Sequence, residues 1–124
     1  MADAKTKVLL VEDDKMIIDM YTLKFSQEGY DIMQAENGQD GLDLAKSQLP
    51  DIILLDIILP QMDGFTVLKE LKADANTKDI PVVLLTNLGQ DGDVKKGLEL
   101  GANDYLIKAN YTPSQVVDKV KSVV

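Results

Sequence analysis

The 124-residue chain contains no cysteine, no histidine and no tryptophan, and all 13 of its basic residues are lysines. Without cysteine or histidine there is no disulfide, thiol nucleophile or Ser-His-Asp triad, and the usual ligands of zinc or iron are missing. The longest apolar runs, such as residues 52–55, are too short to cross a bilayer, and the polar start MADAKTK does not fit a signal peptide. The sequence therefore predicts a soluble protein, most simply cytoplasmic, with no membrane contact.

The charge balance is acidic, with 21 Asp and Glu residues against 13 Lys and a formal net charge of −8. A nucleic-acid-binding face needs basic residues to meet phosphates, so this balance argues against a nucleic-acid partner. Acidity alone is typical of a solvated surface, and the positions of the carboxylates are therefore more informative than their number. The length suits one domain, expected here to span residues 1–124.

Short apolar runs alternate with patterns typical of helices. The expected strands are residues 8–11, 32–35, 52–55, 82–85 and 105–107. The first, third and fourth are nearly continuous Val, Ile and Leu, as in parallel strands that are covered on both faces. This alternation predicts an α/β fold with three layers and a doubly wound, five-stranded parallel sheet.

Capping residues mark where several of the helices begin and end. The expected helices run from Asp14 to Gly29, from 39 to 47, from 63–64 onward, from 91 to 100, and from Thr112 onward. Asp14 and Thr112 are good N-caps, and a proline follows Thr112 at the first helical position. Glycines at 29 and 101 are expected to end the first and fourth helices.

Polar residues stand directly after four of the five expected strands. Glu12 and Asp13 follow the first strand, Asp56 the third, Thr86 the fourth and Lys108 the fifth. Ligands of doubly wound sheets bind outside the carboxyl ends of the strands, so these side chains are expected to converge if strands one and three are neighbours. Taken singly, each has a plain structural explanation as a turn residue or a solvated lysine; a coincidence of all five is improbable.

The chemistry of these residue types points to a phosphoryl group. Close carboxylates repel one another unless a cation offsets them, and Mg²⁺ prefers a few carboxylates, a backbone carbonyl and waters. Lys108 would add a positive charge and Thr86 a hydroxyl donor. A carboxylate nucleophile is already ionised and needs no general base.

Four stretches of the chain resemble the receiver domain of response regulators in two-component signalling, most closely its stand-alone form. They are VLLVEDD (8–14), DIILLDIILPQMDGFTVLKEL (51–71), PVVLLTN (81–87) and GANDYLIKA (101–109). The resemblance implies a flavodoxin-like fold with strand order 2-1-3-4-5. It also implies a signalling role and no catalysis beyond the domain's own phosphorylation and slow self-dephosphorylation.

By this resemblance, Asp56 is the phosphoacceptor, and the phosphoryl donor is a sensor histidine kinase or a phosphotransfer protein. Asp13 and Asp56 would bind Mg²⁺, or Mn²⁺ in its place, together with the backbone carbonyl of Ile58. Glu12 would act on the ion through a bound water.

The resemblance also implies how the signal leaves the site. Thr86 and Lys108 would hold phosphoryl oxygens, and Tyr105 would be the switch aromatic whose ring moves inward with Thr86. The fourth helix, fifth strand and fifth helix would then regulate a protein partner. The chain ends in the last expected helix, so no output domain is expected.

The chain departs from the family pattern at Ala109 and at Asn87, where the family often has alanine, and two local features of the sequence add further expectations. Ala109 stands where the family has proline, and because a cis bond before a non-proline residue costs about 2.5–4 kcal/mol, a trans link is expected. Bulky Ile58 and Leu88 flank the site and could slow dephosphorylation by blocking water. Gly92 and Gly97 indicate either a weak fourth helix that shifts on switching or close packing against a neighbour.

Two rival functions remain open. An Asp-based phosphohydrolase of the haloacid dehalogenase type is disfavoured because Ile57 and Ile58 follow Asp56 where Asp-x-Asp would be required. A phosphorylation-independent interaction module is the second rival. A flavin-binding variant of it is disfavoured by the Glu-Asp-Asp run after the first strand, which would repel a phosphate.

Overall fold

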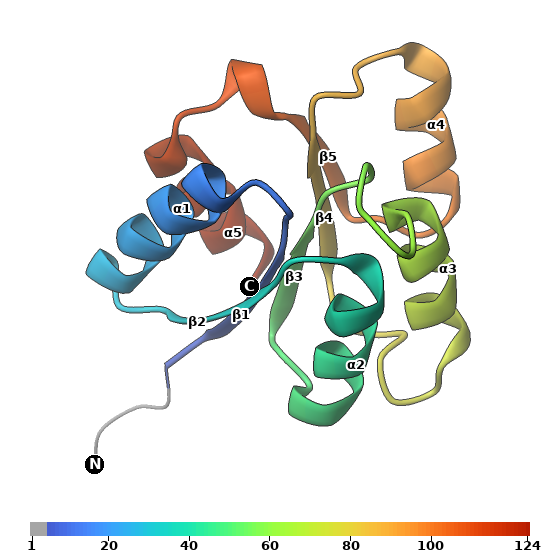
Figure 1. Cartoon of the computed structure of the whole chain (residues 1–124), viewed down its shortest axis with the longest axis horizontal. Coiled ribbons are helices and arrows are strands. Elements are labelled where there is room, and N and C mark those ends of the chain that lie inside the picture. Colours follow the sequence, from blue (N-terminus) through green and yellow to red (C-terminus); the bar gives the residue numbers. More distant parts are fainter. Residues whose placement is uncertain (1–4) are drawn as a thin grey trace.

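The computed structural model describes residues 5–124 and contains a five-stranded parallel sheet with helices on both faces (Figure 1). The strand order is β2-β1-β3-β4-β5, as predicted. In chain order the elements are β1 (Lys7–Val11), α1 (Lys15–Gln27), β2 (Asp31–Ala35), α2 (Gly38–Gln48), β3 (Ile52–Leu55), α3 (Gly64–Ala73), β4 (Val82–Thr86), α4 (Asp91–Glu99), β5 (Asp104–Ile107), the 3₁₀ turn η1 (Lys108–Asn110) and α5 (Pro113–Val123). None of the described helices is long and apolar enough to span a membrane.

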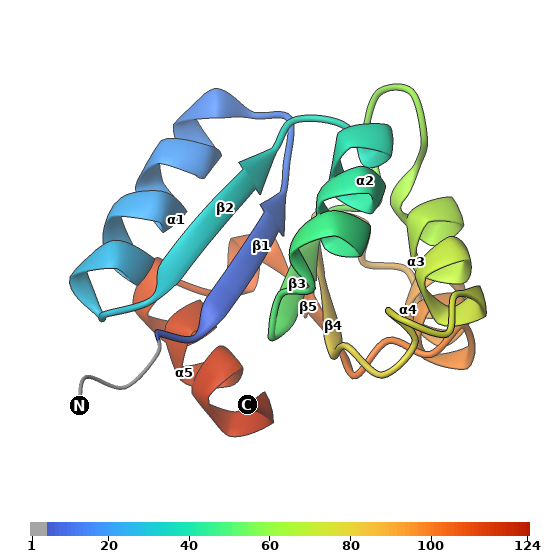
Figure 2. The same cartoon turned by 90° about the horizontal axis from the view of Figure 1, so that it is seen from below.

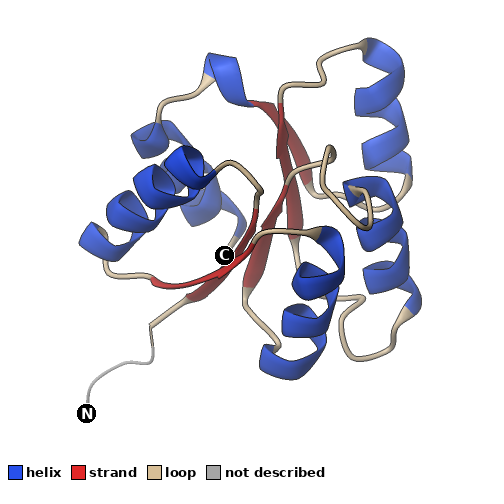
Figure 3. Ribbon diagram, in the orientation of Figure 1, coloured by secondary structure: helices blue, strands red, loops and turns tan. Residues whose placement is uncertain are grey.

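The sheet separates two layers of helices. Helices α1 and α5 cover one face, and α2, α3 and α4 cover the other (Figures 1 and 3). Along β1 the side chains alternate: Leu9 and Val11 pack toward α2 and α3, whereas Val8 and Leu10 pack toward α1 and α5. Strands β1, β3 and β4 are buried on both faces, which explains their continuous apolar sequences.

All five strands run the same way, so their carboxyl ends meet at one edge of the sheet. Figure 2 shows β1 and β2 side by side with both arrowheads at that edge, and β2 at the free side of the sheet. The loops that follow the strands therefore come together there, where ligands of such sheets bind.

The predicted helix caps are present. The Asp14 side chain accepts hydrogen bonds from the backbone N–H of Met16 at 3.0 Å and of Ile17 at 3.4 Å. Thr112 and Gln115 form a reciprocal capping box at the start of α5. The glycines after α1 and α4 have φ values of +89° and +106°, the left-handed conformation that ends a helix.

The segment after β5 differs from the expectation in one respect. Residues Lys108–Asn110 form a single 3₁₀ turn that the sequence did not predict. Every peptide bond within residues 5–124 is trans, which confirms the trans link predicted before Ala109.

Leu49 has a strained backbone at the end of α2, and its replacement by glycine is expected to stabilise the protein. Its φ of 46° is left-handed, which costs a non-glycine residue about 1–2 kcal/mol, and its side chain is 51% exposed. Part of this gain is lost to the flexibility of glycine in the unfolded chain. Leu49→Gly should raise the free energy of unfolding by up to about 1 kcal/mol in a urea titration.

The matched control is Leu98→Gly, because Leu98 is similarly exposed at 47% but lies inside α4. This change should lower stability by roughly 1 kcal/mol, since glycine disfavours a helix interior. If both variants were destabilised alike, strain at Leu49 would be refuted.

Candidate functional site

Four loops at the carboxyl edge of the sheet form one cleft. Val11 at the end of β1 pairs with Leu55 at the end of β3, and the backbone N–H of Asp56 donates to the Val11 carbonyl at 3.0 Å. This pairing places the residues after β1 beside those after β3. The cleft has a volume of about 240 Å³ and is lined by Glu12, Asp13, Asp14, Ile17, Asp56, Ile58, Thr86, Asn87 and Lys108.

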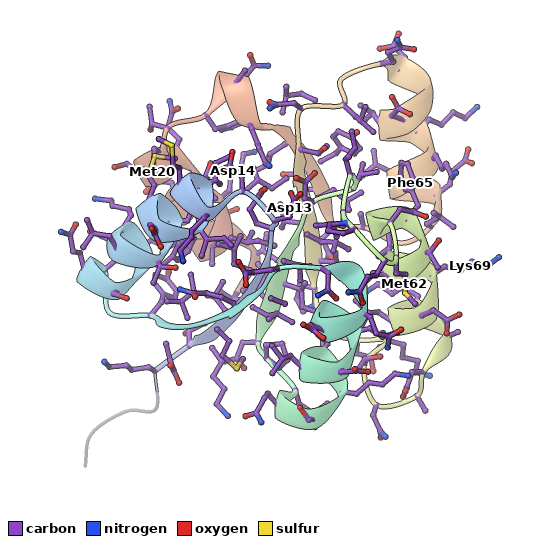
Figure 4. All side chains as sticks on the ribbon, in the orientation of Figure 1. Asp13, Asp14, Met20, Met62, Phe65 and Lys69 are labelled. Atoms are coloured by element: carbon purple, nitrogen blue, oxygen red, sulfur yellow. The ribbon has the colours of Figure 1, made fainter. Side chains whose placement is uncertain are left out.

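Three carboxylates gather in this cleft. Glu12, Asp13 and Asp56 each have an oxygen within 4.8 Å of the other two. Glu12 and Asp56 are buried, whereas Asp13 is exposed in the loop between β1 and α1 (Figure 4). Hard oxygen donors at this spacing, one of them open to solvent, suit Mg²⁺.

Lys108 compensates the buried acids. Its Nζ donates a hydrogen bond to Asp56 Oδ2 at 2.7 Å and another to Glu12 Oε2. Burial alone would lower the pKa of Lys108, but its hydrogen bonds to Asp56 and Glu12 outweigh this effect and raise the pKa. Burial raises the pKa of Glu12, and its bond with Lys108 opposes that shift. Lys108 therefore carries a fixed positive charge in the cleft.

The backbone around Asp56 orients its carboxylate. Asp56 Oδ1 accepts hydrogen bonds from the N–H groups of Ile57 at 2.7 Å and Ile58 at 3.3 Å. Gly64, at the start of α3, donates its N–H to the Ile57 carbonyl at 2.7 Å. A β-carbon at Gly64 would overlap the Asp56 carbonyl, so only glycine lets α3 begin this close to the cleft.

Thr86 and Tyr105 occupy different places. Thr86 is buried at the end of β4 and lines the cleft, where its Oγ1 accepts a 3.4 Å hydrogen bond from the Leu88 N–H. Tyr105 does not line the cleft; its hydroxyl donates to the Leu88 carbonyl at 2.5 Å. Burial first, and then the charges of Asp93 and Asp56, raise the pKa of Tyr105 to about 12. The backbone of Leu88 thus connects Thr86 and Tyr105 through two hydrogen bonds.

The structure brings together the predicted residues Glu12, Asp13, Asp56, Thr86 and Lys108, with Ile58 at the rim. Sequence reasoning did not predict that Asp14, Ile17 and Asn87 line the same cleft. Asp14 and Asn87 also follow strand ends, which was the available signal. Leu88 was expected to flank the site; it is half-buried against the hydrophobic core on the face of the sheet covered by α2 and α3, and it is not among the lining residues.

The fold and the cleft together define the class of protein: a doubly wound α/β domain with an acidic cleft at the carboxyl ends of its strands. Comparison with known families identifies the family to which this domain belongs. The model of the response regulator receiver domain matches residues 8–121, and the chain belongs to this family of two-component signalling domains.

Individual relatives agree with this assignment. The chain is 45% identical over 102 residues, or 82% of its length, to the DNA-binding dual master transcriptional regulator RpaA of Synechocystis, of which the match covers 42%. It is also 45% identical over 102 residues to the response regulator PleD of Caulobacter vibrioides. This match covers 82% of the chain but 22% of PleD. The chain thus spans less than half the length of these curated relatives.

Solved structures show the same fold. The chemotaxis response regulator CheY4 of Vibrio cholerae matches with a TM-score of 0.90 and 26% identity, covering 98% of this chain and 100% of that chain. The phosphorylated cyanobacterial phytochrome response regulator RcpA matches with a TM-score of 0.81 and 31% identity, covering 97% and 91% of the two chains.

Proposed function

We propose that this domain accepts a phosphoryl group on Asp56 and thereby switches its affinity for a protein partner. The observation that carries the proposal is the arrangement at the cleft: the Asp56 carboxylate lies 2.7 Å from the Lys108 ammonium, beside the oxygens of Glu12 and Asp13. RcpA, a relative of the same fold, is described in its phosphorylated form.

The transfer itself needs no general base from the protein. An Asp56 oxygen would form a bond to phosphorus as the bond from phosphorus to the donor imidazole breaks, and the imidazole takes up a proton from solvent. The donor must lie on another molecule because the chain has no histidine. A sensor histidine kinase or a phosphotransfer protein would supply phosphohistidine, and a small acyl phosphate could replace it.

The donor set at the cleft fits Mg²⁺, or Mn²⁺ in its place. Asp13 and Asp56 would bind the ion directly with the backbone carbonyl of Ile58, and Glu12 would hold one of its waters. When bound, the ion would neutralise negative charge on the carboxylates and the incoming phosphoryl oxygens. The chain's own residues orient the acceptor: Ile57 and Ile58 hold one Asp56 oxygen through their N–H groups.

Lys108 and Thr86 would bind the transferred group from the opposite side. Lys108 already contacts Asp56 and can exchange that contact for a phosphoryl oxygen. Thr86 lines the same cleft with its hydroxyl. Movement of Thr86 would shift the backbone at Leu88, whose carbonyl accepts a hydrogen bond from Tyr105. The conformational change would thereby be transmitted to β5 and to the neighbouring helices α4 and α5.

The partner that delivers the phosphoryl group is expected to dock on α1. Met16, Met20 and Leu23 are exposed and recur at helical spacing on α1, whose N-cap is Asp14 (Figure 4). An exposed apolar stripe on the helix that contributes Ile17 to the cleft suits packing against a helix of the donor protein. The net charge of −8 disfavours nucleic acid as a partner of this domain, and we place its action in the cytoplasm.

Incubation with acetyl phosphate tests the proposal. With Mg²⁺, intact mass should show one added phosphoryl group, and without divalent cation the yield should fall at least tenfold. Turnover of phosphate esters, with many molecules hydrolysed per protein, would instead support the phosphohydrolase. Undiminished partner binding in an unphosphorylatable protein would support the phosphorylation-independent module.

Ile58 is expected to prolong the life of the phosphoryl group. Its side chain is 63% exposed at the rim of the cleft, where it can exclude water from the phosphoaspartate. Ile58→Asn would place a water-binding amide there, and loss of the phosphoryl group should become roughly tenfold faster, equal to about 1.4 kcal/mol in the barrier.

The control is Leu49→Asn, another exposed apolar residue that lies at the opposite edge of the sheet. Its phosphoryl lifetime, measured by intact mass over time, should equal that of the parent. An unchanged lifetime in Ile58→Asn would show that the residue does not shield the site.

A further inference from the structure

A groove lies along the free edge of the sheet. It has a volume of about 520 Å³ and is lined by residues of α1, of α2 and of the end of β2. Helices α1 and α2 cover opposite faces of the sheet, so a groove that touches both must cross the edge where β2 has no outer neighbour. Figure 2 shows β2 at that free side, between the two helices. The groove shares no lining residue with the cleft that contains Asp56.

The backbone of β2 has hydrogen-bonding groups that point away from the sheet. Asp31 donates its N–H to the Thr6 carbonyl at 2.9 Å, so every second residue from Asp31 onward faces β1. The N–H and C=O groups of Ile32 and Gln34 therefore point outward, where the described part of the chain has no strand to pair with them. The strand contains neither the lysine nor the proline that commonly protects such an edge. It is thus a template for an added strand.

Four carboxylates line the groove against a single ammonium group. Asp19 lies on α1, Glu36 follows β2, and Asp40 and Asp43 lie on α2; all four are exposed. The one lysine among the lining residues is Lys15. The ion pairs within residues 5–124 include none of these five side chains. The groove therefore carries negative charge that no lysine offsets, and it is complementary to a cationic segment.

We propose that this edge binds an extended, basic segment of another protein as an added strand beside β2. The backbone of the segment would pair with Ile32 and Gln34. Its basic side chains would alternate between the two faces of the sheet and so meet the acids of α1 and of α2. A second copy of this chain is a poor occupant, because pairing of two β2 edges would bring the same carboxylates against each other. The binding is independent of the function proposed above and is measured on the unphosphorylated chain.

A fluorescein-labelled peptide of about six residues, alternating lysine and valine, tests the proposal. In a fluorescence polarisation titration it should bind saturably to the full chain with a Kd below about 1 mM. Salt screens exposed charges, so raising NaCl from about 0.05 to 0.5 M should weaken binding about tenfold. A peptide with glutamate in place of lysine should not bind. The lysine peptide with a fully N-methylated backbone keeps its charge but cannot donate, and it should bind about tenfold more weakly.

Hydrogen exchange identifies the backbone groups that the peptide covers. When the peptide is bound, the N–H groups of Ile32 and Gln34 should exchange about tenfold more slowly. Those of Met33 and Ala35 already face β1 and should change less. No saturable binding of the lysine peptide, or binding without protection at Ile32 and Gln34, would overturn the proposal.

Gln34→Pro removes one outward N–H from the edge. Proline is tolerated on edge strands where the N–H faces solvent, so the variant should fold, and it should bind the peptide about tenfold more weakly. The matched control is Gln34→Thr, which keeps the N–H but, like the proline variant, loses the 2.6 Å hydrogen bond from the Gln34 amide to Thr22 Oγ1. It should bind like the parent, and equal affinity of the two variants would contradict strand addition. If Gln34→Pro does not fold, hydrogen exchange and the charge variants still decide.

Paired charge variants separate the groove from the net charge of the chain. Asp19→Asn combined with Asp43→Asn should weaken binding of the lysine peptide about tenfold. Glu70→Gln combined with Asp118→Asn removes the same charge from exposed acids outside the groove and should leave binding unchanged. An equal loss in both pairs would show that net charge alone attracts the peptide. A dimer of the parent that Gln34→Pro dissociates in sedimentation would make a second copy the occupant; either result would overturn the proposal.

Discussion

Asp56→Asn is expected to remove all phosphorylation of the domain by acetyl phosphate. Asparagine has nearly the same shape and can still receive the N–H groups of Ile57 and Ile58 on its amide oxygen. It lacks the anionic oxygen that forms the bond to phosphorus. Intact mass should show one added phosphoryl group on the parent in the presence of Mg²⁺ and none on the variant.

Asp14→Asn is the matched control for this experiment. Asp14 lines the same cleft, but its carboxylate caps α1, and asparagine caps a helix equally well. This variant should be phosphorylated like the parent. Phosphorylation of Asp56→Asn to the extent of the parent would show that another residue is the acceptor.

The loss in Asp56→Asn should not come from unfolding. The change removes one of two carboxylates that Lys108 contacts and leaves the bond from Lys108 to Glu12 in place. Because the buried acids repel each other, the free energy of unfolding should stay within about 1 kcal/mol of the parent or rise. A urea titration of the variant checks this.

Lys108→Met is expected to have the largest effect on stability. The Lys108, Glu12 and Asp56 side chains are 10%, 2% and 8% exposed, so removal of the ammonium leaves two buried carboxylates uncompensated. Breaking a buried pair in this way costs about 3–5 kcal/mol. Urea unfolding in the presence of EDTA should show a loss of this size.

Divalent cation should restore part of that stability. A cation that binds only the folded state stabilises it according to its concentration and affinity. Added Mg²⁺ should stabilise Lys108→Met more than it stabilises the parent. In the variant, no ammonium group offsets the negative charges of Glu12 and Asp56, so the cation takes over that role. Equal stabilisation of both proteins would argue against the site at Glu12, Asp13 and Asp56.

Lys119→Met serves as the control for the loss of a lysine. Lys119 pairs with Asp104 at 3.5 Å, but the two side chains are 40% and 37% exposed. Exposed pairs contribute about 0–1 kcal/mol because water and salt screen them. If Lys119→Met cost as much as Lys108→Met, burial would not be the reason for the effect at Lys108.

Local signals in the chain were enough to predict the architecture. Continuous Val, Ile and Leu runs identified β1, β3 and β4 because both of their faces are covered. Asp14 and Thr112 marked helix starts because a side-chain oxygen satisfies free N–H groups within the next few residues. The η1 turn was missed because no comparable capping residue precedes it.

The members of the cleft were predictable for a related reason. In a parallel sheet the residue after each strand must lie at the carboxyl edge, so Glu12, Asp56 and Lys108 could be assigned to one place from their positions alone. The hydrogen-bond partners of these side chains at that edge were not predictable. The bond from Lys108 to Glu12 joins residues 96 positions apart and depends on how far the side chains reach across the edge.

The amino-acid order by itself determined the element types, the strand ends and the residue types available at the cleft, because periodicity, capping and strand direction act over a few residues. Only the tertiary structure decided that Tyr105 lies outside the cleft, that Leu88 packs inward, and that Gly97 rather than Gly92 is closely packed. These outcomes depend on distances between segments far apart in the chain, where a difference of one ångström separates contact from overlap.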